Sequence, residues 1–375
     1  MKNCLFVTKH DPFGMGGGSY ATNAYLKLFI SLFPNLDLCM AEECIKDTSL
    51  ISKERLFGVK KRNIFEKTLQ TLFGIYHRFY NYVLNLDLDK YDVIVLDHSS
   101  VSASFVRMLN KKHILTVTIH HNVEKEYYLS NSKNIYKWIA AFFIQRNEKI
   151  AYKNSVLNLF LTEYDKNYFL RKYGLCKGTN FVSSFFFENT NFFENTNCRK
   201  KYDFVISCTL SSIQNQNMVI NFLSKYENLL KNYKLLITGR NPSDELKKLV
   251  ENFSNITLIA NPENMQNVIS EAKIYLCPIE NGGGIKVRCF DAISMLMPAL
   301  VHENALRGYE VLKDKFFYSY SDINNFVKQI DVLLKQYDRI LREKDKYKEI
   351  AIENFSLHHV QVMINDILAL KEECE

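Results

Sequence analysis

The sequence predicts an α/β protein with two doubly wound, Rossmann-like domains. Its 375 residues exceed the size at which one hydrophobic core keeps growing, so two domains are expected. In each half, short apolar runs alternate with longer segments of helical period, the pattern of βαβ units and parallel sheets. Residues 186–201, FFENTNFFENTNCRKK, have neither period and separate the two alternating regions.

The domain boundaries follow from this pattern. We expect an N-terminal domain over 1–185, a linker over 186–201 and a C-terminal domain over 202–355. The strands predicted in the first domain are 3–8, 36–40, 92–96, 113–119 and 156–161. The helices predicted there are 19–32, 64–84 and 135–152. The strands predicted in the second domain are 203–208, 234–238, 256–259, 274–277 and 299–302.

The last predicted element is an amphipathic helix within residues 356–375. Its apolar residues are spaced i, i+3, i+4, i+7 and i+8, at Val360, Met363, Ile364, Ile367 and Leu368. A stripe of this kind needs an apolar surface to cover. We expect the helix to return to the N-terminal domain.

Composition argues against several classes of protein. The first residues hold only a short apolar run before charged, Gly and Pro residues, so no secretory signal is predicted. No run of about 18 uncharged apolar residues occurs, so no membrane span is predicted. The nine cysteines show no CxxC pair and no zinc-site spacing. We therefore expect reduced thiols, no metal site and a cytoplasmic protein.

The net charge of +7 lies entirely in the first half. Residues 1–198 hold 25 Lys and Arg against 18 Asp and Glu, whereas residues 199–375 hold 23 of each. A basic face in the first half could meet an anionic membrane or an anionic acceptor. A solvated surface without a partner is the alternative.

The most informative segment is 277–300, CPIENGGGIKVRCFDAISMLMPAL. A predicted strand leads into three glycines at 282–284, and a helical pattern opens near Ile285 and runs to Met297. Glycines let a ligand approach the backbone closely, and a helix start offers N–H groups to phosphate. A nucleotide diphosphate fits this pattern, and a tight turn that packs helix on strand is the other interpretation.

This segment resembles the donor-site motif of family 4 retaining glycosyltransferases, in the subgroup that reads GGGIK. The upstream SSIQNQN and TGR segments follow the family's order too, and the resemblance is good over residues 200–310 and looser in the first half. It implies a GT-B fold, with two domains facing a cleft, and these donor-binding residues: Gly283, Gly284, Ile285, Lys286, Asp291, Arg240 and Asn217. In catalysis, Lys286 would offset charge on the leaving diphosphate and Asp291 would hold the ribose.

Two departures from the family pattern stand out. The family's pair of glutamates, eight positions apart, falls on Gly283 and Asp291 here. Many members also carry an Arg and a Lys on the first loop of the C-terminal domain, and SSIQNQN has neither. Lys286 and Arg240 are the nearby cations that remain, and we expect Lys286 to take this role.

A second glycine loop, GMGGGSYATNAYL, spans residues 14–26. It puts Gly16, Gly17 and Gly18 between the first strand and a helix that Ser19 is predicted to cap. It resembles the family's loop that reaches the donor phosphates and the acceptor. The GxGxxG dinucleotide spacing fails at Ser19, so NAD binding stays an alternative with little support.

Two histidines close the predicted strand at 113–119. His120 and His121 would lie at the carboxyl edge, where doubly wound sheets bind ligands. His121, Asn122 and Glu124 resemble the family's HN-x-E signature, in which the histidine contacts the transferred sugar. A structural histidine is the alternative, and the sequence leaves open which of the two faces the site. His98, after an earlier strand, is a secondary candidate.

Residues 55–84 join a basic cluster to an aromatic, amphipathic pattern. The cations are Arg55, Lys60, Lys61, Arg62 and Lys67. Docking on an anionic membrane, at its inner face, is one interpretation, and a core-facing helix with solvated lysines is the other. No nucleic-acid module is recognisable, so we expect no nucleic-acid partner.

Together these features predict a hexosyltransferase that uses a nucleotide-sugar donor. The expected acceptor is a hydroxyl of a surface glycan, carried on a lipid, and the resemblance implies retention of configuration without an obligatory metal or other cofactor. A nucleotide-sugar 2-epimerase of the same fold is an alternative that would need further catalytic carboxylates. A degenerate partner subunit is another, suggested by Asp291 and the missing Arg and Lys.

Overall fold

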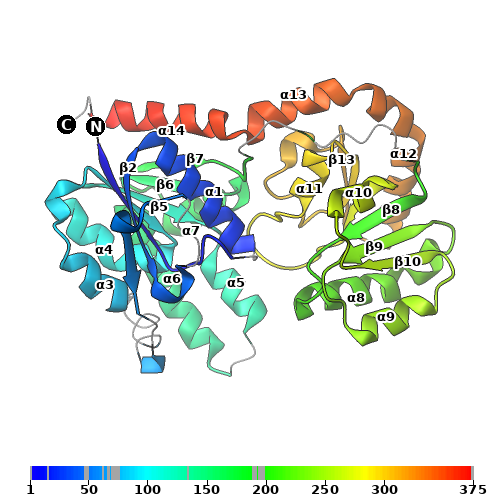
Figure 1. The fold of residues 1–375 in the computed structure, drawn as a ribbon, viewed down its shortest axis with the longest axis horizontal. Helices are drawn as coiled ribbons and strands as arrows, with labels where there is room; N and C mark the ends of the chain where they lie inside the picture. The colour runs from blue at the N-terminus through cyan, green and yellow to red at the C-terminus, as the bar shows by residue number, and fades with distance from the viewer. Residues whose placement is uncertain are drawn as a thin grey trace. The chain divides into compact units, whose positions relative to one another are not determined.

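The computed structural model describes residues 2–14, 17–45, 50–60, 63–65, 68, 77–132, 135–187, 192 and 199–372, and Figure 1 shows its fold. The chain divides into two compact units. Unit 1 comprises Met1–Glu188, Gly282–Ile285 and Asn354–Glu375. Unit 2 comprises Asn189–Asn281 and Lys286–Glu353. Most of the linker predicted at 186–201 lies outside the described residues.

Unit 1 contains a 7-stranded sheet in which every neighbouring pair of strands is parallel. Its strands are β1 (Asn3–Thr8), β2 (Asn35–Ala41), β3 (Leu56–Val59), β4 (Val93–Asp97), β5 (Leu115–His120), β6 (Leu157–Phe160) and β7 (Thr179–Val182). Their order in the sheet is β3-β2-β1-β4-β5-β6-β7. The doubly wound prediction is confirmed. The two edge strands, β3 and β7, were not predicted, because each has four mostly half-buried residues and no long apolar run.

Along the chain, the helices of unit 1 lie between the strands of its sheet. They are α1 (Gly17–Leu32), α3 (His77–Leu84), α4 (Ser99–Lys111), α5 (Glu124–Asn131), α6 (Lys137–Asn154) and α7 (Glu163–Tyr173), with 3-10 turns at Glu42–Cys44, Lys53–Arg55 and Leu88–Lys90. The helix α1 buries Ala21, Tyr25, Leu28 and Phe29, which recur at helical spacing. The prediction that Ser19 caps this helix is wrong, because α1 already begins at Gly17.

Two other helix predictions in unit 1 have different outcomes. The helix predicted at 135–152 corresponds to α6. Of the helix predicted at 64–84, residues 66–67 and 69–76 lie outside the described residues, and α3 forms its last part. The helices α4, α5 and α7 were not predicted.

Unit 2 contains a 6-stranded sheet that is also parallel throughout. Its strands are β8 (Tyr202–Ser207), β9 (Leu235–Gly239), β10 (Ile256–Ala260), β11 (Ala272–Cys277), β12 (Ala299–His302) and β13 (Phe317–Tyr320), in the order β10-β9-β8-β11-β12-β13. Its helices are α8 (Ile213–Leu230), α9 (Asp244–Glu251), α10 (Met265–Ser270), α11 (Cys289–Ser294), α12 (Ile323–Arg342) and α13 (Lys344–Phe355), with a 3-10 turn at Glu310–Leu312. The five predicted strands are present, and β13 was missed.

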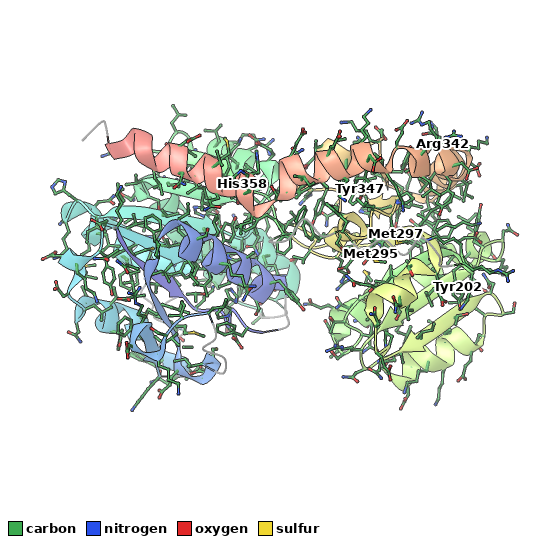
Figure 2. All side chains as sticks on the ribbon, turned by 45° about the horizontal axis from the view of Figure 1, so that its top comes forward. Tyr202, Met295, Met297, Arg342, Tyr347 and His358 are labelled. Atoms are coloured by element: carbon green, nitrogen blue, oxygen red, sulfur yellow. The ribbon has the colours of Figure 1, made fainter. Side chains whose placement is uncertain are left out.

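The helix α13 is fixed to the body of unit 2 by Tyr347. The ring of Tyr347 stacks on Phe316 with ring centroids 4.0 Å apart. Its hydroxyl donates to the carbonyl oxygen of Met297 over 3.5 Å (Figure 2). The turn between α11 and β12 is thereby held from outside the sheet.

The C-terminal helix α14 (Leu357–Glu372) belongs to unit 1 and packs against α1 (Figure 1). Val360, Ile364 and Leu368 are buried, whereas Met363 is 38% exposed. The expectation that the C-terminal helix returns to the N-terminal domain is therefore confirmed. The buried stripe is narrower than predicted, because Met363 lies at its edge.

This packing leads to a stability prediction. Ile364→Ala should lower the free energy of unfolding by about 2–5 kcal/mol, because it removes a fully buried side chain and leaves a cavity. Met363→Ala, one residue away on the exposed side, should change it by much less. Urea unfolding followed by circular dichroism measures both variants, and equal effects would contradict the packing of α14.

Candidate functional site

In unit 1, the carboxyl ends of three adjacent strands bring polar side chains together. Thr8 ends β1, Asp97 ends β4 and His120 ends β5, and Thr8 is paired in register with Asp97. The order of strands reverses between β1 and β4. In doubly wound sheets this switch point is where ligands bind, because the connections leave toward opposite faces of the sheet.

Asp97 is the centre of this group and is fully buried. Its Oδ2 accepts hydrogen bonds from the hydroxyls of Thr8 (2.7 Å) and Thr22 (2.8 Å). Its Oδ1 lies 2.5 Å from Nε2 of His121. Burial alone would raise the pKa of Asp97, but the neighbouring His121 and His10 lower it below its usual value. The carboxylate is therefore ionised at neutral pH.

The contact with Asp97 sets the orientation of His121. Because Nε2 donates to the carboxylate, Nδ1 is the ring nitrogen left for another partner. The ring also stacks on His98, with ring centroids 4.8 Å apart and planes 11° from parallel. The structure thus places His121 between two side chains that follow or end β4, Asp97 and His98.

His120 points into a different environment. Its Nε2 lies 2.9 Å from Oδ1 of Asn158, and its ring stacks on Phe160 and meets the edge of Phe169. Burial lowers the pKa of His120 to about 4. These aromatic contacts assign His120 to the packed interior, so His121 is the histidine that joins Asp97.

His98 and Glu124 form a second buried pair. Nδ1 of His98 contacts Oε1 of Glu124, which begins α5. Burial lowers the pKa of His98; it would raise that of Glu124, but His98 and Lys9 lower the pKa of Glu124 to about 2. At neutral pH a neutral imidazole therefore lies in contact with an ionised carboxylate. His98 also has a φ of 92°, and non-glycine residues held in such a conformation cluster at functional sites.

His10 is a member of this group that the sequence interpretation missed. It follows β1, and its ring centroid lies 4.7 Å from that of His98 and 5.9 Å from that of His121. Burial lowers the pKa of His10 to about 2, so the ring is neutral. A lone histidine between the first strand and the glycine loop was the signal that could have identified it.

Several buried polar atoms in this region have no hydrogen-bond partner within the described residues. Nδ1 of His98 and Oε1 of Glu124 contact each other, whereas Nε2 of His10, Nδ1 of His120 and Oδ1 of Asn122 have no such contact. Buried polar atoms without a partner are rare in folded proteins and call for an explanation, such as a bound ligand or water. They mark the part of unit 1 where a polar ligand would gain hydrogen bonds.

The first glycine loop lies next to these histidines. Gly16 is outside the described residues, and Gly17 and Gly18 form the first turn of α1. A Cβ at Gly18 would lie 3.5 Å from Cε1 of His10, in ordinary contact. A side chain at position 18 would therefore lie directly against the ring of His10.

The second glycine loop follows β11, at the point where the strand order of unit 2 reverses between β8 and β11. Gly282 and Gly284 have φ values of 103° and 67°, which favour glycine. The segment Gly282–Ile285 belongs to unit 1, and there a Cβ at Gly284 would lie 2.8 Å from the carbonyl oxygen of His121. Gly283 would place its Cβ 3.7 Å from Cβ of Asn122.

The helix predicted to open near Ile285 begins later. The helix α11 spans only Cys289–Ser294, and residues 285–286 have no regular structure. The first three residues of α11 donate backbone hydrogen bonds to the three residues before it, from Cys289 to Lys286 (2.9 Å), Phe290 to Val287 (2.9 Å) and Asp291 to Arg288 (3.0 Å). Gly284, at a positive φ, does not belong to the helix, and a turn at 287–288 comes before its first residue.

Asp291 lies in α11, against β11. Its Oδ2 accepts a hydrogen bond of 3.3 Å from the hydroxyl of Tyr275, which also donates to the carbonyl oxygen of Ser207 in β8. Burial raises the pKa of Asp291 to about 6, against the smaller lowering effects of Tyr275 and Arg288. Asp291 therefore titrates close to neutral pH.

Arg288 is the cation at this switch point that the sequence interpretation missed. Its Nη2 donates to Oδ1 of Asn215 in the first turn of α8, and its Nη1 lies 3.6 Å from Sδ of Met218. The guanidinium thus joins the segment after β11 to the start of α8, the helix that follows β8. Its place two residues after Lys286 was the available signal, and it supplies a cation where SSIQNQN has none.

The other predicted donor-site residues are more dispersed. The side chain of Lys286 is 8% exposed, and its carbonyl oxygen accepts a 3.1 Å hydrogen bond from the hydroxyl of Tyr309. Asn217 is exposed in α8, and Arg240 is exposed after β9. Asn215, rather than Asn217, is the α8 residue that meets Arg288.

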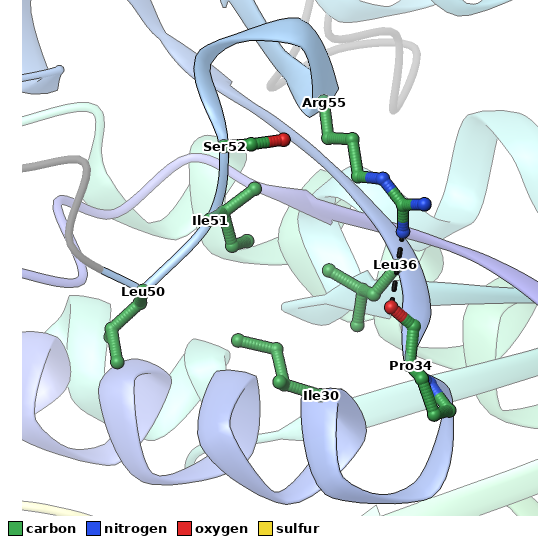
Figure 3. Close-up of a pocket in the computed structure, with 7 residues that line it drawn as sticks. All are labelled: Ile30, Pro34, Leu36, Leu50, Ile51, Ser52 and Arg55. Atoms are coloured by element: carbon green, nitrogen blue, oxygen red, sulfur yellow. Dashed lines mark hydrogen bonds between the residues drawn. The ribbon is translucent and has the colours of Figure 1, made fainter.

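A small pocket in unit 1 lies away from the switch point of that unit. Its walls are formed by Ile30, Pro34, Leu36, Leu50, Ile51, Ser52 and Arg55 (Figure 3). Arg55 donates to the carbonyl oxygen of Pro34 and to Oδ1 of Asn35, each over 3.0 Å. Pro34 precedes β2, so the pocket is at the amino edge of the sheet. Across the part of the chain that the structure describes, no group of three His, Cys, Asp or Glu side chains is arranged to hold a metal ion.

Comparison with known proteins agrees with this architecture. Residues 203–341 match the family model described as glycosyl transferases group 1. Sucrose-phosphate synthase from Thermosynechococcus elongatus is 12% identical, with a TM-score of 0.71 over 100% of both chains. Anabaena Alr3699/HepE in complex with UDP is 10% identical, with a TM-score of 0.68 over 98% of this chain and 99% of that one.

The lipopolysaccharide outer core galactosyltransferase WaaB, in its apo form, is 12% identical, with a TM-score of 0.64 over 99% of this chain and 100% of that one. At these identities the solved structures establish the fold, and no curated protein sequence matches the chain. Residues 203–341 therefore match a group 1 glycosyl transferase domain, and the chain as a whole has the two-domain α/β fold of these solved structures.

Proposed function

We propose that the protein transfers a hexose from a nucleoside-diphosphate sugar to a hydroxyl of a lipid-linked surface glycan, with retention of configuration. The observation that carries the donor part is the loop after β11. It combines two glycines at positive φ, a switch point of the sheet, and the charged side chains of Arg288 and Asp291 directly afterwards. The acceptor and the stereochemistry rest on the family resemblance.

The donor's diphosphate is proposed to lie over Gly283, Gly284 and Ile285, with Lys286 and Arg288 offsetting its charge. Backbone N–H groups and cations that are already in position stabilise charge as it develops on a leaving group. Because these cations serve that purpose, the proposed reaction needs no obligatory metal. Structures of Alr3699/HepE contain UDP or UDP-glucose, so UDP-glucose is the first donor to test.

His121 is proposed to contact the transferred sugar through Nδ1, while Asp97 holds the ring from the other side. With Nε2 held by Asp97, the ring offers one defined hydrogen-bonding atom to a sugar hydroxyl. Gly17 and Gly18 would border the acceptor. These roles agree with the buried, partner-free atoms of His10 and Asn122 in the same region.

The central test is donor turnover by purified protein. UDP release from UDP-glucose and other nucleotide sugars is measured with and without glycan acceptors, for the wild type and for Asp291→Ala, Lys286→Ala and Arg288→Ala. Loss of one hydrogen bond to a charged group costs about 1.5–3 kcal/mol, which is roughly a 10- to 150-fold weaker donor affinity. Lys248→Ala, an exposed lysine of α9, is the matched control.

Three results would contradict the proposal. Unchanged release in all three variants would remove the donor-site assignment. Conversion of the donor sugar to an isomer without any acceptor would identify an epimerase instead. Calorimetry that detects no nucleotide affinity would favour a degenerate subunit.

The pKa of Asp291 leads to a prediction on pH. A carboxylate accepts hydrogen bonds from ribose hydroxyls, and the raised pKa means that Asp291 is half protonated near pH 6. Donor affinity should therefore fall as the pH drops from about 7 through 6, a range in which a sugar diphosphate itself does not titrate. Titration calorimetry at several pH values measures this, and the decline should be absent in Asp291→Asn.

The position of Asp97 leads to a prediction on catalysis. Asp97→Asn keeps the size of the side chain but no longer fixes the tautomer of His121, so kcat should fall by up to roughly 100-fold through misplacement of the ring. The KM for the donor should change little, because the diphosphate and ribose contacts belong to other residues. A raised donor KM with unchanged kcat would show that Asp97 acts elsewhere.

A further inference from the structure

A stripe of large apolar side chains is exposed at the start of α6. Trp138, Ile139 and Phe142 are 66%, 58% and 64% exposed, and the preceding Ile135 and Tyr136 are 84% and 67% exposed. Single exposed apolar residues are normal, but contiguous ones mark interaction surfaces. We call these five residues the apolar tip of α6.

Cations continue the same face of the helix. Trp138, Phe142, Arg146 and Lys149 follow one another at spacings of four, four and three residues, which keeps them on one side. Arg146 and Lys149 are exposed, whereas Ala141, Asn147, Glu148, Ala151 and Tyr152 are buried on the opposite side. Four residues of helix advance about 6 Å, so the first cation lies one turn behind the apolar tip.

The charge that α6 presents to solvent is positive throughout. The helix carries Lys137, Arg146, Lys149 and Lys153, and its one acidic residue is Glu148. Glu148 is buried. It accepts a 2.6 Å hydrogen bond from the backbone N–H of Glu124 and a 3.2 Å hydrogen bond from the hydroxyl of Tyr173. Its carboxyl therefore does not offset the exposed cations.

We propose that this face of α6 docks on an anionic lipid bilayer. Trp and Tyr favour the interface between water and hydrocarbon, and cations one turn behind would reach lipid phosphates. Charge complementarity selects this partner: residues 1–198 carry all of the +7 net charge. A symmetric contact with a second copy would instead bring the same cations together.

This surface differs from the basic segment expected at 55–67. Lys61, Arg62 and Lys67 lie outside the described residues, and Arg55 hydrogen-bonds within unit 1. Among the described residues no helix is long and apolar enough to cross a membrane, so the contact would be peripheral. The docking does not depend on the proposed transferase chemistry.

The test uses Trp138 as its own probe, because it is the one tryptophan of the chain. Full-length protein is titrated with phosphatidylcholine vesicles containing 30% phosphatidylglycerol, an amount we choose to give an anionic surface, and with pure phosphatidylcholine vesicles. With the anionic vesicles we expect a blue shift of Trp138 emission, quenching by brominated lipid, and co-sedimentation that weakens as salt is added. A spectrum that stays unchanged would overturn the proposal, as would a shift on raising protein concentration without lipid, which would indicate self-association.

Variants separate the apolar and the charged contributions. Arg146→Gln with Lys149→Gln should weaken binding to anionic vesicles by roughly 25-fold, at about fivefold per cation. Phe142→Ser should abolish the blue shift of Trp138 emission. Co-sedimentation with the vesicles measures the binding of this variant separately. Leu175→Ser, an 82% exposed leucine elsewhere in unit 1, and Lys248→Gln in unit 2 are the controls and should bind as the wild type does. Equal losses in the controls would contradict a docking face on α6, and UDP release without lipid reports the transferase proposal separately.

Discussion

Every strand in both sheets runs parallel to its neighbours, and this direction decides where polar groups can gather. A parallel strand must be followed by a crossover, so all carboxyl ends meet at one edge of the sheet. Where the order reverses, between β1 and β4 and between β8 and β11, the flanking loops separate and leave backbone groups accessible. His10, His98 and the β11 loop all follow strands at these two positions, although they are far apart in sequence.

The buried carboxylate of Asp97 shows what this arrangement requires. An ionised carboxylate away from water is costly unless hydrogen bonds replace its hydration. Two threonine hydroxyls and one imidazole supply them, from β1, α1 and the end of β5. The hydrogen bond from His121 helps to offset the cost of burying Asp97. The same bond fixes the ring of His121, which is proposed to meet the sugar.

Periodicity was sufficient for the central strands and insufficient for the edges and the site details. Long apolar runs predicted β1, β4 and β11, whereas β3 and β7 are short and half-buried and carry no such run. The start of α11 was predicted near Ile285 but lies at Cys289, after Gly284 at φ 67° and a turn at 287–288, and the apolar spacing records neither. The resemblance placed His121 and Asp291, but only the packing against Phe160 separates His120 from His121, and only the contact with Asn215 shows Arg288 at the switch point.

The distribution of charge points to two different anionic ligands. Residues 199–375 have no net charge, yet they hold the proposed diphosphate site, so local placement of Arg288 and Lys286, not a general field, must attract the donor. The excess of cations in residues 1–198 is then not needed for the donor. On α6, two of these cations lie on the same face as the exposed apolar tip. A small anion needs only a cluster of N–H groups and one guanidinium. Exposed aromatic residues and cations together on one face fit a bilayer surface better.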